Sequence, residues 1–372
     1  MQKKVLTVLG TRPEAIKLAP VIQALRARTA QLASCVCVTG QHREMLGPFL
    51  ELFKIEPNWN LDLMKPDQSL FELTASILTA LQPIFESQKP DIVLVQGDTT
   101  TAFAASLAAF YSQIPVGHVE AGLRSQERYS PFPEEVNRRL TSVLSTLHFA
   151  PTERTKENLL RENVPAESIF VTGNTVVDAL LTILDEHGSS GHTAESWAAP
   201  DKKLILVTGH RRENFGAGLA NLCHALKRIA AENQDVEIVY PVHLNPRVST
   251  AVRAELVGAK RIHLLPPLDY LTFIRLMSRA YLIVTDSGGI QEEAPSLGKP
   301  VLVTRQVTER QEALEAGAAK LVGTEAEHIA TEVQILLDDP VEYHRMATAG
   351  NPFGDGKAAQ RIVRILHEIL ND

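Results

Sequence analysis

One turn in the second half of the sequence has the residue types that bind an anion. Ser287-Gly288-Gly289 lies between an apolar run, residues 281–285, and a helical segment that begins near Gln291. Ser287 can cap that helix, and the two glycines let the backbone approach a ligand closely. The N–H groups at a helix start favour a phosphate. Glu293, farther into the helix, is placed to accept hydrogen bonds from ribose hydroxyls, although a tight turn without a ligand is the alternative.

Two other turns place cations after a predicted strand. Arg12 and Lys17 stand at a helix start in which Pro13 fits the first turn, and two cations there suit a diphosphate. The pattern lacks the glycine spacing of a P-loop. His210 and His243 follow strands of the second half, where a histidine can bind a phosphate or donate a proton. Each of these side chains could instead be structural or solvated.

Three acids occupy positions that suit proton transfer. Asp98 and Glu120 each follow an apolar strand, and Glu134 begins a helix that also carries Arg138. Acids rarely follow buried strands without a partner or a task, and converging carboxylates shift one another's pKa values. The alternatives are that Asp98 only caps a helix and that Glu134 only complements the helix dipole.

Metal and disulfide sites are not expected. The His118-Val119-Glu120 triplet matches part of the zinc deaminase pattern, but the cysteine half of that pattern is missing. The chain has 3 cysteines, an odd number that does not suit a disulfide framework. Cys35 and Cys37, two apart on a predicted strand, are interpreted as buried thiols.

Short apolar runs alternate with longer helical segments, which predicts βαβ units and parallel sheets covered on both faces. Strands are expected at residues 4–9, 35–39, 92–95, 116–119, 148–150, 169–171, 204–207, 237–240, 262–264, 282–285 and 301–303. Helices are expected at residues 15–28, 70–85, 101–111, 134–144, 153–161, 176–185 and 358–370.

The rhythm predicts an α/β protein with two doubly wound domains. An N-terminal domain is expected over residues 1–186, a linker over 187–200, a C-terminal domain over 201–356 and a final helix over 357–372 that could pack back on the first domain. Open α/β sheets bind ligands beyond the carboxyl ends of their strands. Two such sheets face to face would therefore place the site in the cleft between the domains.

Composition excludes several classes of partner. The 372 residues carry a net charge of −7 without a basic stripe, which argues against nucleic acid and an anionic membrane. The apolar run at residues 5–9 is too short for a signal peptide, and no run approaches the length of a membrane span. A cytoplasmic protein that acts on a small molecule is expected.

Taken together, the motifs resemble the non-hydrolysing UDP-N-acetylglucosamine 2-epimerases of bacteria. The segments that carry the resemblance, in family order and over essentially the whole chain, are Gly10–Lys17, Gly97–Thr101, Gly117–Arg124, Pro131–Arg138, Thr208–Glu213, Tyr240–Pro246 and Thr285–Gly298. The resemblance implies the GT-B arrangement of two Rossmann-like domains facing across a cleft, and a homodimer.

The resemblance also implies a reaction. UDP-N-acetylglucosamine and UDP-N-acetylmannosamine would interconvert, without NAD or a metal, by elimination of UDP to 2-acetamidoglucal and re-addition, supplying a precursor of bacterial surface polysaccharide. Asp98, Glu120 and Glu134 match the family's proton-transfer carboxylates, and the sequence does not decide which is the base. The residues carried over to the diphosphate, ribose, nucleoside and sugar are Arg12, Lys17, His210, His243, Ser287, Gly288, Gly289, Glu293, Phe273, Arg310 and Arg138.

Some positions depart from the family pattern. Gln41 and His42 match the start of a region that binds an activating second substrate molecule in some members, but Glu44 and Asp67 replace Gln and Arg there. The added negative charge argues against assuming the same allostery. Gln96 replaces a His and Gln311 replaces a Pro, and neither change removes a proposed catalytic group.

Three other functions compete. A hydrolysing 2-epimerase would release free N-acetylmannosamine and UDP, and a GT-B glycosyltransferase would share the nucleotide half without needing three acids. A non-catalytic UDP-sugar sensor could lose the acids altogether, whereas this chain keeps them all.

Overall fold

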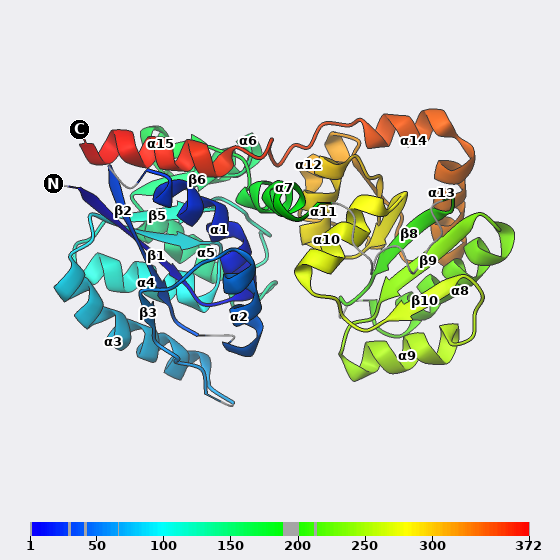
Figure 1. Ribbon diagram of the computed structural model, residues 1–372, viewed down its shortest axis with the longest axis horizontal. Coiled ribbons are helices and arrows are strands. Elements are labelled where there is room, and N and C mark those ends of the chain that lie inside the picture. The colour runs from blue at the N-terminus through cyan, green and yellow to red at the C-terminus, as the bar shows by residue number, and fades with distance from the viewer. Residues whose placement is uncertain are drawn as a thin grey trace. The chain divides into compact units, whose positions relative to one another are not determined.

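The computed structural model describes residues 2–28, 31–40, 43–65, 67–188, 201–211 and 214–371. The chain forms two compact units (Figure 1). Unit 1 combines Met1–Ala179 with Phe353–Asp372, and unit 2 is Leu180–Pro352. The boundary therefore falls inside a helix, α7 (Thr175–His187), instead of in the linker expected at 187–200, most of which lies outside the described residues.

Unit 1 contains a parallel sheet of seven strands in the order β3-β2-β1-β4-β5-β6-β7. The strands are β1 (Lys3–Leu9), β2 (Leu32–Val38), β3 (Trp59–Asn60), β4 (Ile92–Gln96), β5 (Val116–Val119), β6 (Leu147–Ala150) and β7 (Ile169–Val171). All the longer strands were expected, within three residues at each end, whereas the two-residue β3 was not.

Helices alternate with these strands, as the pattern predicted. They are α1 (Arg12–Arg26), α2 (Arg43–Leu52), α3 (Leu70–Gln88), α4 (Thr100–Tyr111), α5 (Glu134–Leu144), α6 (Glu153–Arg161), the 3₁₀ helix η1 (Ala166–Ser168), α7 and α15 (Ala358–Asn371). The last helix returns to unit 1 and packs against α1. Asp178 of α7 fixes its start by accepting the backbone N–H groups of Ala358 and Ala359 at 3.2 and 2.8 Å.

Unit 2 repeats the architecture with six parallel strands in the order β10-β9-β8-β11-β12-β13. They are β8 (Lys203–Thr208), β9 (Val236–Pro241), β10 (Ile262–Leu265), β11 (Leu282–Thr285), β12 (Val301–Val303) and β13 (Ala319–Leu321). Its helices after α7 are α8 (Ala217–Glu232), α9 (Pro246–Leu256), α10 (Tyr270–Arg279), α11 (Gly288–Glu293), the 3₁₀ helix η3 (Ala294–Leu297), α12 (Gln311–Glu315), α13 (Ala326–Asp338) and α14 (Pro340–Ala347).

The central strands owe their position to continuous apolar runs. Every residue of β4 is buried, as is every residue of β11, because helices cover both faces of a parallel sheet. Cys37 and Cys223 are buried and Cys35 is half-buried, and all three are free thiols. Cys35 is therefore more exposed than expected.

The order of the strands in each sheet brings together the turns that carry the predicted functional residues. In unit 1, β1, β4 and β5 are neighbours, so the turns after them lie at one edge of the sheet. In unit 2, β9, β8, β11 and β12 are neighbours in the same way. Since ligands of open α/β sheets bind beyond the carboxyl ends of the strands, these two edges are where functional side chains are expected.

Candidate functional site

Glu120 lies at the centre of a polar cluster in unit 1. It directly follows β5, is 7% exposed, and its backbone is left-handed, with φ of 64°. One carboxylate oxygen accepts hydrogen bonds from Lys17 Nζ and from Asn174 Nδ2, the latter at 2.9 Å, and the other accepts from Gln96 Nε2. A left-handed backbone is costly for a residue with a Cβ, so these contacts hold the side chain in place against that cost.

Asp98 lies at the same edge, after β4. Arg138 Nη2 donates to its carboxylate, and Asn137 Nδ2 donates to its backbone carbonyl at 3.0 Å. Arg138 is in turn held 3.5 Å from Glu135, a fully buried carboxylate. Helix α5 therefore presents Arg138 to Asp98 as a positioned cation, consistent with its predicted role of orienting an acid or the sugar.

Glu135 anchors the start of α5, although the sequence pattern did not mark it as functional. It accepts the backbone N–H of Ser125 at 2.9 Å and lies 3.1 Å from Arg139 Nε. Two cations and a backbone donor thus satisfy a carboxylate that is fully buried. Its neighbour Glu134 contrasts with it, because the buried Oε2 atom of Glu134 has no hydrogen-bond partner among the described residues. Buried polar atoms are nearly always paired, so this oxygen is a candidate to receive a ligand.

The turn after β1 is tied to the turn after β4. Glu14 is fully buried and accepts the backbone N–H groups of Gly10 and Thr11 at 3.0 and 2.7 Å and the Thr99 hydroxyl at 2.7 Å. Burial raises the pKa of Glu14 to about 7, although these hydrogen bonds oppose the shift. Glu14 therefore positions the turns that carry Arg12 and Asp98.

The two cations of this region have different surroundings. Arg12 is exposed, and its guanidinium lies 5.7 Å from the centre of the Phe49 ring. Lys17, predicted to bind a diphosphate, is paired in the structure with Glu120. Its position links it to the carboxylate cluster, and its role toward a diphosphate stays a prediction.

His118 is a structural residue. It is fully buried, and its Nε2 atom lies 2.7 Å from the carbonyl oxygen of Gly97. Burial lowers the pKa of His118 to about 3, so the ring is neutral at ordinary pH. Among the described residues no group of three or more histidine, cysteine or acidic side chains lies close enough to hold a metal ion.

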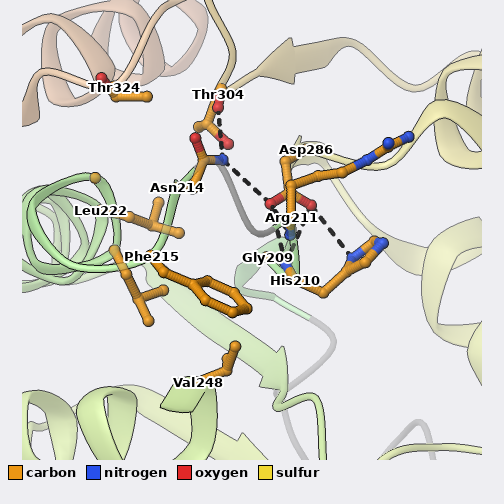
Figure 2. A pocket seen from close by; sticks show the side chains of 12 residues that line it. Gly209, His210, Arg211, Asn214, Phe215, Leu222, Val248, Asp286, Thr304 and Thr324 are labelled. Atoms are coloured by element: carbon orange, nitrogen blue, oxygen red, sulfur yellow. Dashed lines mark hydrogen bonds and ion pairs between the residues drawn. The ribbon is translucent and has the colours of Figure 1, made fainter. Parts of the chain in front are cut away.

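In unit 2 the matching edge is organised by Asp286, which follows β11 and is 1% exposed. Its carboxylate accepts the backbone N–H groups of His210 and Arg211 at 3.0 and 2.9 Å and the Asn214 amide at 3.2 Å. The His210 Nδ1 atom lies 3.2 Å from its Oδ1 atom. Figure 2 shows the carboxylate at the centre of these contacts and the His210 ring turned away from Leu222.

His243 stacks on His210. The two ring centres are 5.7 Å apart and the planes are tilted by 19°. His243 Nδ1 accepts the backbone N–H of Asn245 at 3.1 Å, so this nitrogen carries no proton. The turns after β8 and β9 thus bring together the two histidines that were predicted from the sequence.

The predicted anion cradle is a turn before a helix, as expected, but the helix begins at Gly288, and Ser287, at the N-cap position, makes no side-chain capping hydrogen bond. The Ser287 backbone N–H donates to the Thr285 hydroxyl at 2.9 Å. A Cβ added to Gly288 would lie 3.1 Å from Glu309 Oε1, which is tight, whereas one added to Gly289 would meet nothing closer than 3.9 Å. Gly289 is exposed, so its backbone is the part of the cradle open to a ligand.

Glu293 is buried, and its carboxylate accepts the Tyr270 hydroxyl at 2.8 Å. Tyr270 begins α10, the helix that also carries the half-buried Phe273. Glu293 and Phe273 thus come from two neighbouring elements of unit 2, and the ribose and nucleoside roles expected for them stay predictions.

Arg310 belongs to a charge network beside the cradle. Its Nε atom donates to Glu292 at 2.8 Å, and Nη1 lies 3.3 Å from Glu309. Burial alone would raise the pKa of Glu309, but Arg310 and Arg305 outweigh it and lower this pKa to about 2. The side chains next to Gly288 therefore carry two positive and two negative charges, those of Arg305 and Arg310 and of Glu292 and Glu309.

The cavity drawn in Figure 2 lies behind the polar edge of unit 2. Its volume is about 10 Å³, about the room that one water molecule needs. Apolar side chains such as Phe215 and Val248 line it together with Asp286 and Asn214. It therefore lies beside His210 and has room for about one water molecule.

Several contributors were not predicted from the sequence. Asp286 directly follows β11, and Asn174 lies three residues after β7. Positions after a strand often carry function, but neither residue was assigned a role from the sequence. Gln96, noted only as a departure, contacts Glu120. Gln41 and His42 lie outside the described residues. Within the described ranges no helix has the length and apolar character needed to cross a membrane.

Known proteins resemble this chain over its full length. The family model described as UDP-N-acetylglucosamine 2-epimerase matches residues 23–367. The UDP-N-acetylglucosamine 2-epimerase of Escherichia coli strain K12 is 57% identical over 369 residues, which cover 98% of each chain. A putative enzyme of the same name from Thermotoga maritima is 55% identical over 98% of this chain and 97% of that protein.

Solved structures of UDP-GlcNAc 2-epimerases also match this chain over nearly its full length. The UDP-GlcNAc 2-epimerase from Neisseria meningitidis, bound to UDP-GlcNAc, is 51% identical and matches with a TM-score of 0.91 over 98% of this chain and 100% of that one. The enzyme from Methanocaldococcus jannaschii, in complex with UDP-GlcNAc and UDP, is 38% identical and matches with a TM-score of 0.82 over 98% and 99%.

Proposed function

Because the chain belongs to the UDP-N-acetylglucosamine 2-epimerase family, we propose that it interconverts UDP-N-acetylglucosamine and UDP-N-acetylmannosamine without hydrolysis. The observation that carries the proposal is the arrangement at the carboxyl edge of the unit 1 sheet. There, Glu120 and Asp98 follow adjacent strands and are each paired with a cation, Lys17 and Arg138. Such pairs hold the carboxylates in fixed positions at one edge of the sheet, as proton transfer requires.

The reaction inverts a carbon whose proton is weakly acidic. Removal of the C2 proton by a carboxylate is coupled to breakage of the bond between C1 and the phosphate oxygen. The electrons of the C–H bond form a C1–C2 double bond, and UDP leaves with those of the C–O bond. Re-addition of UDP, with a proton delivered to the opposite face of C2, gives the other epimer. Asp98, Glu120 and Glu134 share these two proton transfers.

Departure of UDP needs groups that accept the charge developing on its phosphate. We assign this task to Arg12, His210 and the Ser287-Gly288-Gly289 turn, because fixed donors aimed at developing charge lower a reaction barrier. The open backbone at Gly289 and the exposed guanidinium of Arg12 support the assignment.

No redox cofactor or metal is part of the proposal. Elimination and re-addition exchange a proton and UDP and move no hydride, so NAD has no step to perform. The cationic side chains supply the charge that a metal would otherwise give. Treatment with EDTA followed by gel filtration should leave turnover unchanged, and a loss restored by a divalent cation would contradict this part.

The test is to incubate the protein with UDP-N-acetylglucosamine in D₂O and follow the sugar by NMR. The expected product is UDP-N-acetylmannosamine that carries deuterium at C2, with deuterium also entering the recovered substrate. Free N-acetylmannosamine as the main product would identify a hydrolysing enzyme instead. A bound but unchanged substrate would refute the enzyme assignment.

Amide variants of the carboxylates test their roles. Asp98→Asn, Glu120→Gln and Glu134→Gln should each lose at least about 100-fold in kcat, the scale of one acid–base catalyst, and still bind UDP. Asp91→Asn is the matched control, because Asp91 precedes β4 at the opposite edge of the same sheet and pairs with Lys3. Unchanged turnover in one of the three variants would remove that residue from the mechanism.

A homodimer is a further proposal. Phe110 and Tyr111 at the end of α4 are 59% and 70% exposed, and exposed apolar patches mark protein interfaces. Light scattering should give the mass of two chains for the native protein and a shift toward one chain for Tyr111→Glu. A native monomer would refute it.

A further inference from the structure

Asp286 is a buried carboxylate that touches the candidate catalytic histidine, and its role is not explained by the fold alone. The Oδ2 atom accepts the backbone N–H groups of His210 and Arg211 and the Asn214 amide. The Oδ1 atom lies 3.2 Å from both the backbone nitrogen and the Nδ1 atom of His210. The backbone donors fix the carboxylate, so its second oxygen is permanently presented to the His210 ring.

This geometry favours one protonation state of the ring. The Nδ1 atom and the Asp286 carboxylate form an ion pair only when the ring is protonated, and a carboxylate is an acceptor only, so the contact favours hydrogen on Nδ1. The Nε2 atom lies on the opposite side of the imidazole. It can donate a hydrogen only when both ring nitrogens are protonated, which is the positively charged form.

We propose that Asp286 is a positioning residue that keeps His210 doubly protonated, so that the Nε2–H group is available to the phosphate oxygen of the departing UDP. This inference rests on the proposed function and deepens it. When the bond between C1 and the phosphate oxygen breaks, its electron pair goes to that oxygen. The Nε2–H group stabilises the new charge by hydrogen bonding, and when UDP adds back the electron pair returns to C1.

Negative charge behind the ring supports this state. A carboxylate in contact with one nitrogen of an imidazole orients the ring and stabilises its protonated form, as in serine proteases. Here two backbone N–H groups and an amide hold the carboxylate, so it is unable to turn away when the ring changes charge. Preorganised charge of this kind costs no rearrangement during the reaction.

The other charged groups near His210 in the described part of unit 2 pair with one another. Arg211, next in the chain, lies 3.4 Å from Glu309, which also pairs with Arg305 and Arg310. His243 is stacked on the ring, and its Nδ1 atom accepts the Asn245 backbone N–H. Asp286 is therefore the group whose charge compensates that of His210.

Asp286→Asn is the informative substitution. The amide oxygen can take the place of Oδ2 and keep the contacts with the two backbone N–H groups and with Asn214. The amide NH₂ then faces His210 Nδ1, and this contact requires Nδ1 to be unprotonated so that it can accept a hydrogen bond from the NH₂ group. The ring is thereby driven to its neutral form with hydrogen on Nε2, and the positive charge is lost without loss of the turn.

The experiment is a ¹⁵N NMR titration of the histidine side chains, with His210 assigned from the His210→Gln variant. In Asp286→Asn the protonation midpoint of His210 should fall by about one pH unit or more, the usual effect of one adjacent charge. The alkaline limb of kcat should move to lower pH by the same amount, a loss of about tenfold at a fixed pH on that limb. KM should change by less than about threefold, since uniform binding is retained.

Two controls separate positioning from support of the fold. Asp339→Asn makes the same substitution at another carboxylate that accepts backbone N–H groups, those of Val341 and Glu342, and should leave the His210 midpoint unchanged. In the His210→Gln background, Asp286→Asn should cause no further change in the pH profile. A merely structural role would lower activity equally at every pH and leave the midpoint in place, and either result would overturn the proposal.

The native protein gives an independent reading if Asp286→Asn does not fold. The ¹⁵N shifts of both ring nitrogens of His210 should be those of protonated nitrogens at neutral pH, and the shift of an unprotonated nitrogen at Nδ1 or at Nε2 would refute the inference. Because this measurement needs no turnover, it can succeed even where the D₂O experiment shows no epimerisation. Failure of the proposed function is thus distinguishable from failure of the positioning role.

Discussion

Replacement of Glu14 by Gln should make the protein more resistant to alkaline pH. The folded state holds the pKa of Glu14 at about 7, against an ordinary value of 4.5. Below 4.5 both the folded and the unfolded state are protonated. Between 4.5 and 7 the unfolded state loses the proton that the folded state keeps, so the free energy of unfolding falls as pH rises.

The size of the effect follows from that difference. Above pH 7 the cost levels off at about 3 kcal/mol, since a tenfold difference in proton affinity between the two states is worth about 1.4 kcal/mol. About 2.5 kcal/mol of it develops between pH 5 and pH 8. A glutamine removes the titration but keeps an oxygen for the N–H groups of Gly10 and Thr11, and its NH₂ can donate to Thr99.

Urea unfolding followed by circular dichroism at several pH values measures this. The stability of Glu14→Gln relative to the native protein should rise by about 2.5 kcal/mol from pH 5 to pH 8. Glu72→Gln is the matched control, because Glu72 occupies the same place in the capping box of α3 but is exposed. The Ser69 backbone N–H and then its hydroxyl lower the pKa of Glu72, so its contribution is lost only in acid. A Glu14→Gln difference that does not vary with pH would refute the reasoning.

Three further outcomes are expected. Between pH 7 and pH 5 the free energy of unfolding should fall by about 2 kcal/mol less in His118→Gln than in the native protein. Burial holds the pKa of His118 at about 3 in the folded state, so only the unfolded state takes up a proton below the ordinary pKa of 6.5. Equal losses in urea titrations of the two proteins would contradict this. Gly122→Ala should lower the free energy of unfolding by more than about 2 kcal/mol, since φ is +91° and the new Cβ would overlap the Thr155 carbonyl oxygen; a native melting temperature would count against it. Gly289→Ala meets no such contact, so it should keep its stability and weaken UDP binding about tenfold in calorimetry, the effect of about 1.4 kcal/mol, and unchanged UDP affinity would exclude Gly289 from the cradle.

Elements built from long buried runs could be predicted from the sequence. The expected bounds of β5 and β11 agree with the structure at both ends, because four consecutive buried residues leave little ambiguity in a parallel sheet. β13 has only three residues, one of them a lysine, and β3 has two. Such strands exist because a neighbouring strand offers hydrogen bonds, which a local pattern does not contain.

In the candidate site, too, residues marked by a local sequence pattern could be predicted, whereas contacts between distant parts of the chain could not. Glu120 and Asp98 were predicted because an acid after a buried strand is unusual. Their partners were not, because Lys17 and Asn174 are 103 and 54 residues from Glu120 along the chain. Proximity in sequence favoured placing Lys17 beside Arg12 at a diphosphate, and only the order of β1, β4 and β5 brings it to Glu120. The homodimer and the cytoplasmic location stay predictions.

The return of α15 to unit 1 also determines the order in which the protein is completed during synthesis. Residues 1–179 leave the ribosome before unit 2, but the helix that packs on α1 and is fixed by Asp178 is made after unit 2. Unit 2 is a single uninterrupted segment and has all its own residues before unit 1 has its final helix. A nascent chain therefore carries an unfinished unit 1, with part of the α1 surface uncovered, until α15 has been made.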